Sequence, residues 1–419
     1  MSVDKLAVIV ITDGLRRDSI EAQSTPALDA LRRESVWLRR HRSAAPSVTR
    51  VCSATIATGC SPLRHELAGN KLCLLDQGKL RLLDVGVPSF FSLCRELRGH
   101  VLGVPTLAQR TEAAGGLRMY GAAYVQDPTH RGHVFHRAGS FGPRGQLPQT
   151  EALNVSSDLA GDRAMTERFI DDLENQLAAV NLLWLGHPDT TQHHCPLGSP
   201  EHLEALRRTD ENVSAVYACV DELRRKGKDV LFIAGSDHGH ETVSGLVDID
   251  KKLAEAGFES ELASGRLVTA PNGTAALVYL QAPEAVRARL EAFSRLSDVV
   301  CRRQFELYGI FQAPALEFFL SLKSDPAALN PYGVAGESLA CLVPGSPYPI
   351  GCGQHGGFGL HEQSPYCLVN HPGLRPSEIS AVTDLTLIAP TVLRFLGLSL
   401  DGLDGRSLQQ ILGVPTLGD

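Results

Sequence analysis

Three short hydrophobic runs stand out along the chain: Leu6–Ile11, Val180–Leu185 and Val230–Ala234. They are rich in Val, Ile and Leu and show no alternation of polar and apolar residues. This pattern is typical of strands that are buried on both faces of a parallel sheet. We predict three strands of one parallel sheet.

Helical patterns separate these runs. They cover Pro26–Glu34, Asp158–Ala178 and Pro200–Arg225, and the last two repeat apolar residues at three- and four-residue steps. Strands that alternate with helices predict an α/β fold, with helix, sheet and helix layers around a mostly parallel central sheet. Ligands of such folds bind at the carboxyl ends of the strands.

Two segments depart from this alternation. Residues 100–150 contain many Gly, His and Arg with little periodicity, and we expect a long connection or lid there. Residues 245–349 contain a strand-like run at Thr274–Leu280, a helix-like run at Pro283–Leu296 and then a Pro, Gly and Ser-rich stretch. We expect this second segment to be an inserted cap subdomain.

The chain then returns to the earlier pattern. Tyr366–Asn370 is strand-like, and Leu385–Leu396 is an apolar helical segment that we expect to pack on the core. The predicted domain organisation is therefore a core of residues 1–244 and 350–419 that is interrupted by the cap.

Composition and charge exclude several classes of protein. The 419 residues are 43% hydrophobic and 21% charged, as in ordinary globular proteins, and the net charge of −7 argues against a nucleic-acid polymer as partner. The ten cysteines form no CxxC pair, which favours reduced thiols. The N-terminal apolar run is too short for a signal peptide, and no run approaches the length of a membrane span. We expect a cytoplasmic protein without a membrane partner, and a homo-oligomer is left open.

Aspartates and histidines concentrate directly after the predicted strands. Taken alone, Asp13 before Gly14 is as often a capping or turn residue, and Asp189 with His193 could be a pair on a helix surface. The full set contains three carboxylates and three imidazoles: Asp13, Asp189, His193, Asp237, His238 and His355. Because parallel strands end at the same edge of a sheet, we expect these groups to form the ligands of two divalent cations. Mixed nitrogen and oxygen donors favour zinc over magnesium.

A hydroxyl residue, Thr49, lies just before the helical run Val51–Thr58. A helix N-terminus favours anions such as phosphate, although capping the helix is an equally ordinary role for threonine. A threonine hydroxyl is a poor nucleophile at neutral pH, so a catalytic role requires an adjacent cation.

Seven motifs together resemble the alkaline phosphatase superfamily, and most closely its nucleotide pyrophosphatase/phosphodiesterase branch. In order they are IVITDGLRRD, STPALDAL, APSVTRVCSATIATGCSPLRHELAGN, HPDTTQHH, GSDHGH, GQHGGFG and APTVLRFLGLSLDGLDGRSL. The resemblance covers most of the chain apart from residues 100–150 and 245–349. It implies an alkaline phosphatase-like arrangement of the predicted core.

The resemblance also implies roles for individual residues. One cation is expected at Asp13, Thr49, Asp237 and His238, and the other at Asp189, His193 and His355. Thr49 is then the nucleophile, and Asn70 contacts a phosphoryl oxygen, whereas Asn70 taken alone is an ordinary turn residue after glycine. Zinc is the favoured metal, with manganese as the alternative.

Five histidines within or next to these motifs fall outside the implied ligand set. His240 stands where many relatives have methionine, and we expect it not to contact the implied ligands; the same holds for His65-Glu66, where relatives usually have His-Gly. His361 competes with His355, which we prefer because Gly356-Gly357 follows it. His187 and His194 flank the implied ligands as supporting or exposed residues.

The implied activity is hydrolysis of phosphodiesters or nucleotide pyrophosphates through a covalent phosphothreonine. The partner is then a small phosphate ester or phosphonate. The alternatives are a phosphonate hydrolase similar to phosphonoacetate hydrolase, a phosphate monoesterase, a phosphomutase, and a relative that binds metal without catalysis. Thr49 disfavours the phosphomutase, because that branch usually has a serine, and a complete ligand set disfavours the last.

Overall fold

The computed structural model describes residues 4–87, 89–121, 155–175, 178–294, 299–343, 345 and 349–414, and the backbone of 132–135. Part of the expected lid at 100–150 therefore lies outside the described residues. Within the described residues, no helix combines the length and the apolar character that crossing a membrane requires.

An eight-stranded central sheet forms the middle layer, in the order β18-β2-β17-β8-β1-β7-β5-β6. Its strands are β1 (Lys5–Thr12), β2 (Val36–Arg42), β5 (Leu117–Tyr120), β6 (Gly132–Phe135), β7 (Val180–Leu185), β8 (Asp229–Gly235), β17 (Cys367–Asn370) and β18 (Ser377–Asp384). The pairings of β1 with β7 and with β8 are parallel, as predicted. Only β17 runs antiparallel to its two neighbours, so the mostly parallel α/β fold is confirmed.

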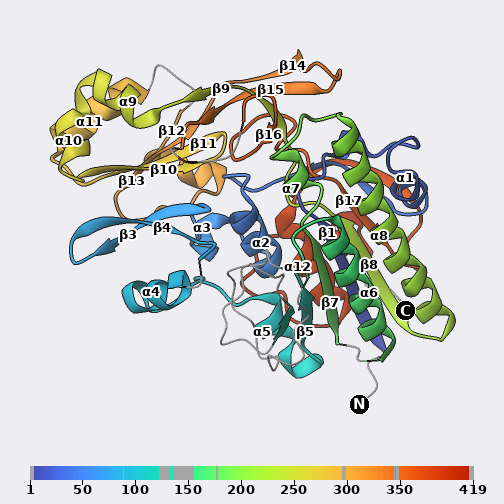
Figure 1. Ribbon diagram of the computed structural model, residues 1–419. Helices are drawn as coiled ribbons and strands as arrows, with labels where there is room; N and C mark the ends of the chain where they lie inside the picture. Colours follow the sequence, from blue (N-terminus) through green and yellow to red (C-terminus); the bar gives the residue numbers. More distant parts are fainter. Residues whose placement is uncertain are drawn as a thin grey trace.

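Helices cover both faces of this sheet (Figure 1). Successive residues of β1 alternate between the two faces: Leu6, Val8 and Val10 pack in one core cluster, and Ala7, Ile9 and Ile11 in the other. The first cluster includes residues of α1 (Pro26–Arg33), α6 (Leu159–Asn175) and α8 (Pro200–Arg225). The second includes residues of α2 (Thr49–Thr58), α5 (Leu107–Thr111), α12 (Ile388–Phe395) and α13 (Leu408–Leu412). Burial on both faces explains why these strands are uniformly hydrophobic.

The structure differs from the expectation for residues 100–150 at several elements: α5 packs on the core, and both β5 and β6 belong to the central sheet. Leu117–Tyr120 forms β5, which pairs in parallel with β7 inside the central sheet. Four residues are too few to produce a recognisable hydrophobic period, and the strand becomes evident only through its partner.

Residues 245–349 contribute most of two further sheets. One has the order β10-β11-β13-β12 and the other β14-β15-β9-β16. Their strands are β9 (Glu241–Val247), β10 (Leu267–Asn272), β11 (Ala275–Leu280), β12 (Val299–Cys301), β13 (Leu316–Ser321), β14 (Ser324–Leu329), β15 (Ala335–Cys341) and β16 (Gly353–Gln354). The helices here are α9 (Ile249–Leu253), α10 (Glu259–Ala263) and α11 (Glu284–Ser294). A separate hydrophobic cluster packs these elements together, and we propose that they form a cap inserted into the core.

The α-helices and strands not yet named are α3 (Pro62–His65), the hairpin of β3 (Lys71–Asp76) and β4 (Lys79–Asp84), α4 (Ser89–Arg98) and α7 (Asp189–Gln192). In Figure 1 the hairpin of β3 and β4 lies next to the region of residues 245–349, and α4 lies on the other side of the hairpin. A fourth hydrophobic cluster joins β3 and α4 to β10, β11 and β13. The hairpin thus connects the chain just after α2 to the cap.

Candidate active site

The carboxyl ends of three central strands bring the predicted ligands together. Asp13 follows β1, Asp189 begins α7 directly after β7, and Asp237 follows β8. The backbone N–H of Asp189 donates to the carbonyl of Asp13 at 3.0 Å, which fixes the first two segments to each other. Residues that are far apart in the sequence therefore meet at one edge of the sheet.

Asp13, Asp237 and His238 form the first group, which we call the carboxylate cluster. Each aspartate has one anchored oxygen: Trp184 Nε1 donates to Asp13 Oδ2 at 2.9 Å, and the Gly14 N–H donates to Asp237 Oδ1 at 3.1 Å. The other two oxygens, Asp13 Oδ1 and Asp237 Oδ2, are buried and accept no hydrogen bond from the described residues. They lie 3.3 and 3.2 Å from His238 Nε2.

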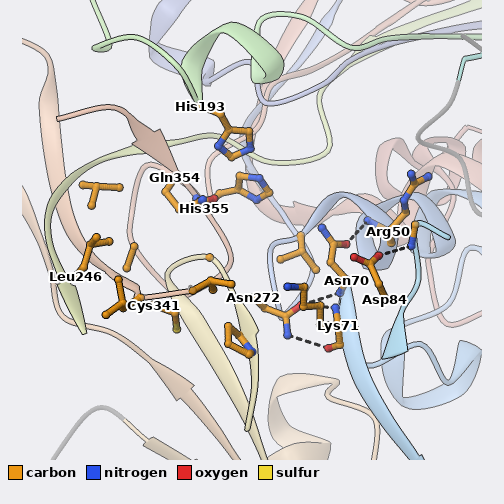
Figure 2. A pocket seen from close by; sticks show the side chains of 18 of the residues that line it. Arg50, Asn70, Lys71, Asp84, His193, Leu246, Asn272, Cys341, Gln354 and His355 are labelled. Carbon is orange, nitrogen blue, oxygen red and sulfur yellow. Dashed lines mark hydrogen bonds between the residues drawn. The ribbon is translucent and has the colours of Figure 1, made fainter. Parts of the chain in front are cut away.

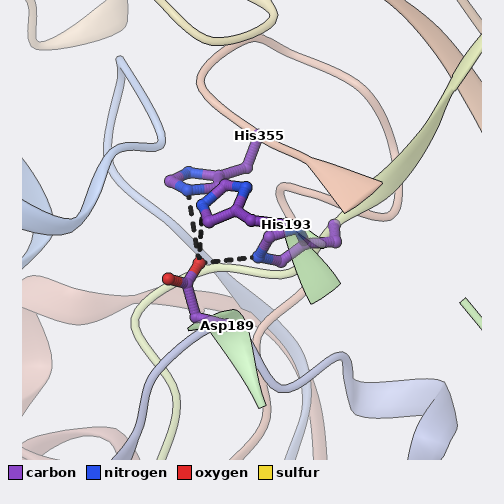
Figure 3. Close-up of side chains that lie close together, drawn as sticks. Asp189, His193 and His355 are labelled. Atoms are coloured by element: carbon purple, nitrogen blue, oxygen red, sulfur yellow. Dashed lines mark hydrogen bonds and ion pairs between the residues drawn. The ribbon is translucent and has the colours of Figure 1, made fainter. Parts of the chain in front are cut away.

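Asp189, His193, His240 and His355 form the second group, which we call the imidazole cluster. Figure 3 shows the side chains of Asp189, His193 and His355 converging. Asp189 Oδ1 lies 3.3 Å from His193 Nε2 and 3.4 Å from His355 Nε2. The two groups adjoin, because the rings of His238 and His355 stack with their centroids 3.6 Å apart.

The pKa of one aspartate in each cluster is shifted, and the two shifts have opposite directions. Burial and the charge of Asp13 raise the pKa of Asp237 well above its usual value. Burial acts the same way on Asp189, but the charge of His193 and hydrogen bonds from three histidines outweigh it and lower the pKa of Asp189. Around His238 the two carboxylates outweigh burial and raise its pKa to about 10.

These residues fit divalent cations. Two buried carboxylate oxygens without a hydrogen bond are costly unless a cation compensates them. Zinc holds nitrogen and oxygen ligands at about 2.0–2.1 Å, which places neighbouring ligands of a tetrahedral site ~3.3 Å apart. The separations of 3.2 to 3.4 Å within the two clusters agree with this value. Nitrogen with oxygen donors suits zinc or manganese better than magnesium.

Thr49 is the first residue of α2, and its side chain lies at the carboxylate cluster. Its Oγ1 is 3.2 Å from His238 Nε2. The segment before α2 is tied to the imidazole cluster, because His355 Nδ1 donates to the carbonyl of Ser47, two residues before Thr49, at 2.7 Å. The hydroxyl therefore lies at the positive end of a helix and beside the carboxylate cluster.

Asn70 lies beside Thr49, and its orientation is fixed. Its Oδ1 accepts the backbone N–H of Arg50 at 2.9 Å, so its Nδ2 remains to donate to a ligand. Asn272 at the end of β10 holds the backbone in place: its Oδ1 accepts the N–H groups of Asn70 at 2.7 Å and of Lys71 at 3.1 Å. The cap thus helps to position a predicted site residue.

A cleft of about 510 Å³ opens next to Thr49 and extends towards the cap. Figure 2 shows Arg50, Asn70 and Lys71 on one side of it and His193 with His355 on another. Aliphatic residues of β9 and β15 line its far end. Among the described residues that line it there is no Phe, Tyr or Trp.

The expectation for His240 is wrong. Its Nε2 lies 2.8 Å from Asp189 Oδ1, so it contacts an implied ligand. The misjudgement has a physical source: His240 lies two residues beyond His238, and only the turn before β9 directs His238 to the carboxylate cluster and His240 to the imidazole cluster. Neither His240 nor Asn272 carries a sequence signal of its own, since Pro271-Asn272-Gly273 has the composition of an ordinary turn.

The other histidines are placed away from the clusters. His361 Nδ1 lies 2.7 Å from the guanidinium of Arg16, so it is held elsewhere. His65 contacts Thr55, His187 contacts Thr191, and His194 is exposed. The structure therefore brings His355, and not His361, to the predicted ligands.

The comparisons with known proteins agree with this geometry. The family model for type I phosphodiesterase/nucleotide pyrophosphatase matches residues 7–308. No curated protein sequence matches the chain significantly.

Solved structures with the same fold include murine ectonucleotide pyrophosphatase/phosphodiesterase 5. It is 14% identical, with a TM-score of 0.69 over 98% of this chain and 99% of that chain. An inactive threonine-to-alanine variant of the murine protein in complex with AMP has a TM-score of 0.68 at 15% identity over 96% and 97% of the two chains. The human protein has a TM-score of 0.67 at 14% identity over the same shares. At these identities the likeness shows the fold.

Proposed function

Because the chain belongs to the type I phosphodiesterase/nucleotide pyrophosphatase family, we propose that it cleaves phosphodiester or nucleotide pyrophosphate bonds through a phosphothreonine at Thr49. The observation that carries this proposal is the position of Thr49. Its hydroxyl lies 3.2 Å from a residue of the carboxylate cluster, and His355 of the imidazole cluster is hydrogen-bonded to the segment that precedes it. Two divalent cations, zinc in the first place and manganese as the alternative, are expected in the clusters.

Each proposed residue has a defined task. Bound cations would lower the pKa of the Thr49 hydroxyl and of a water molecule and offset charge on the phosphoryl group, so no separate general base is needed. Thr49 Oγ attacks phosphorus, which forms a threonine ester and expels the leaving oxygen. Water then cleaves this ester, restores the hydroxyl and releases a phosphate monoester.

Asn70 supports the attack of Thr49 from the side of the cleft that lies across from His193 and His355. With Oδ1 engaged by Arg50 N–H, its Nδ2 can donate to a non-bridging phosphoryl oxygen as negative charge develops there. The N-terminus of α2 adds a favourable partial charge at the same place.

A second candidate, hydrolysis of a carboxylated phosphonate, is supported by the cleft itself. Arg50 and Lys71 line it, and either of these positively charged side chains could pair with the carboxylate of such a substrate. The described lining residues also lack an aromatic ring on which a nucleobase could stack. A small anionic substrate is therefore the alternative to a nucleotide.

A substrate panel distinguishes these candidates. The zinc-loaded and manganese-loaded protein would be assayed with bis-p-nitrophenyl phosphate, p-nitrophenyl phosphate, an NAD-type dinucleotide and phosphonoacetate. We expect the diester to be cleaved faster than the monoester. A strong monoester preference would reject the proposed specificity, and cleavage of phosphonoacetate alone would establish the second candidate.

The variant Thr49→Ala is the matched control for the mechanism. It should bind as many cations as the wild-type protein and lose turnover, because the nucleophile is absent while the histidines and aspartates remain. Full turnover in this variant would reject the phosphothreonine.

We also propose that the protein is cytoplasmic and acts on small molecules rather than on nucleic-acid polymers or membranes. Its ten cysteines are all free thiols, which supports a reducing compartment. Imaging of a tagged protein would test the location, and light scattering would decide whether it forms a homo-oligomer.

A further inference from the structure

His240 is buried at the imidazole cluster, where two roles are open to it. It could be a fourth ligand of the cation at Asp189, or it could hold Asp189 in place without touching the cation. The two roles differ in geometry, because ligands are spaced by the size of the ion whereas a hydrogen bond brings two atoms closer together. The contacts of Nε2 and those of Nδ1 each distinguish a ligand from a positioning residue.

The distance on the Nε2 side is that of a hydrogen bond. His193 and His355 approach Asp189 Oδ1 at 3.3 and 3.4 Å, the spacing of neighbouring ligands around one ion. His240 Nε2 approaches the same oxygen at 2.8 Å. A nitrogen and a carboxylate oxygen this close share a hydrogen.

The Nδ1 side points to the same role. Histidines that bind metals almost always donate their second N–H to an acceptor, which fixes the ring. His193 does so to the Gly353 carbonyl at 3.1 Å, His238 to the Gly239 carbonyl at 3.1 Å, and His355 to the Ser47 carbonyl at 2.7 Å. In contrast, His240 Nδ1 is buried and has no hydrogen-bond partner in the described structure.

A neutral imidazole has one N–H, and the surroundings of His240 assign it to Nε2. Asp189 Oδ1 can only accept, so Nε2 must donate, and Nδ1 is left as an acceptor that faces backbone. The ring fits a narrow space between two glycines. A Cβ on Gly353 would lie 2.9 Å from Nδ1, and one on Gly14, whose φ is +72°, would lie 2.8 Å from Nε2.

We propose that His240 is a positioning residue whose Nε2–H donates to Asp189 Oδ1 and fixes that carboxylate for the cation of the imidazole cluster. A carboxylate oxygen has two lone pairs, so one can face the ion while the other accepts from His240. Because the carboxylate is already oriented, it loses less conformational entropy when the ion binds. This role rests on the proposed two-cation centre and adds an affinity determinant to it.

Zinc affinity, measured without substrate, tests the role. His240→Met removes the donor while it retains an apolar side chain of similar length, and competition with a chromophoric chelator should show an affinity ~10–100-fold lower for one of the two ions. His240→Gln, whose amide can donate to Asp189, should restore most of that affinity. His202→Met is the matched control, because His202 is also buried but contacts none of the ligands.

X-ray absorption of the zinc-loaded protein separates the two roles. If His240 only positions Asp189, three imidazoles are shared by two ions in both the wild-type protein and His240→Met. Loss of an imidazole in the variant would show a ligand and overturn the proposal, as would unchanged zinc affinity. Wild-type protein that binds no divalent cation would overturn the metal centre itself, whereas tight zinc binding without phosphodiesterase activity would reject only the proposed function.

Discussion

The carboxylate cluster and the imidazole cluster adjoin, yet they contain opposite proportions of acid and base. Two aspartates share one histidine in the carboxylate cluster, and each retains a buried oxygen without a hydrogen bond. In the imidazole cluster three histidines surround the single carboxylate of Asp189. The carboxylate cluster therefore needs a cation to offset its negative charge. In the imidazole cluster the histidines already compensate most of the charge of Asp189.

This difference suggests a division of labour. A site with excess negative charge attracts a cation strongly and can share it with a developing alkoxide on Thr49. A site of mostly neutral nitrogens depends more on the exact direction of its ligands, and both of its predicted histidine ligands are oriented by a backbone carbonyl. The following predictions test this contrast.

The largest effect is expected when one ligand is removed from either cluster. His193→Ala and His238→Ala should each retain one of two cations and lose activity by more than about 100-fold, since even supporting residues of metal sites cost 10–100-fold. Metal analysis by mass spectrometry together with a phosphodiester assay measures both. Loss of both cations in either variant would show that the clusters do not bind independently.

The stability of the metal-free protein should respond in opposite directions to neutralisation of one aspartate in each cluster. Because the pKa of Asp237 is raised, its ionised form destabilises the fold above the usual carboxyl pKa, and Asp237→Asn should add about 1–3 kcal/mol at pH 8. The pKa of Asp189 is lowered, so Asp189→Asn should cost a similar amount.

Urea unfolding in the presence of a chelator measures this difference. Asp401→Asn, which changes an exposed aspartate outside both clusters, is the matched control. Equal destabilisation by Asp237→Asn and Asp189→Asn would contradict the contrast between the clusters.

A smaller effect is expected from the cap. Asn272→Ala removes the acceptor for the N–H groups of Asn70 and Lys71, a loss of ~1–2 kcal/mol that would lower kcat roughly tenfold if it acts on the transition state. The cation content should stay at the wild-type value. Asn272→Asp keeps the accepting oxygen and should recover part of kcat; a variant that lost its cations instead would place Asn272 in the metal centre.

The smallest effect concerns a buried histidine without a carboxylate partner. Burial lowers the pKa of His65 to about 3, against 6.5 in the unfolded chain. A lowered histidine pKa means that the unfolded chain takes up the proton first, so stability is lost as pH falls below 6.5. We expect about 0.7 kcal/mol of this loss between pH 7 and pH 6.

The variant His65→Gln should lack this component of the acid sensitivity, which thermal unfolding at the two pH values would measure. His194→Gln, a change at an exposed position, is the control. Identical pH dependence in His65→Gln and the wild-type protein would contradict a lowered pKa for His65.

The sequence predicted a helix or strand correctly where its hydrophobic residues recur in a recognisable pattern. The runs that became β1, β7 and β8 are buried on both faces, and α8 has the bounds that its apolar period and Pro200 indicate. Short elements escaped prediction. Strands β3, β4 and β5 are recognised through the strands with which they pair. Each of them alone is too short to show a clear hydrophobic pattern.

The sequence by itself determined the mostly parallel sheet and which side chains lie at its carboxyl edge, because strand burial and strand ends leave a local record. Only the tertiary structure decided that His240 reaches Asp189 and that Asn272 reaches across from the cap to Asn70. Those contacts depend on where separate segments cross within a few ångströms, and hydrogen bonds require that proximity. A residue's type names the chemistry that it can supply, but its neighbours in space determine which task it performs.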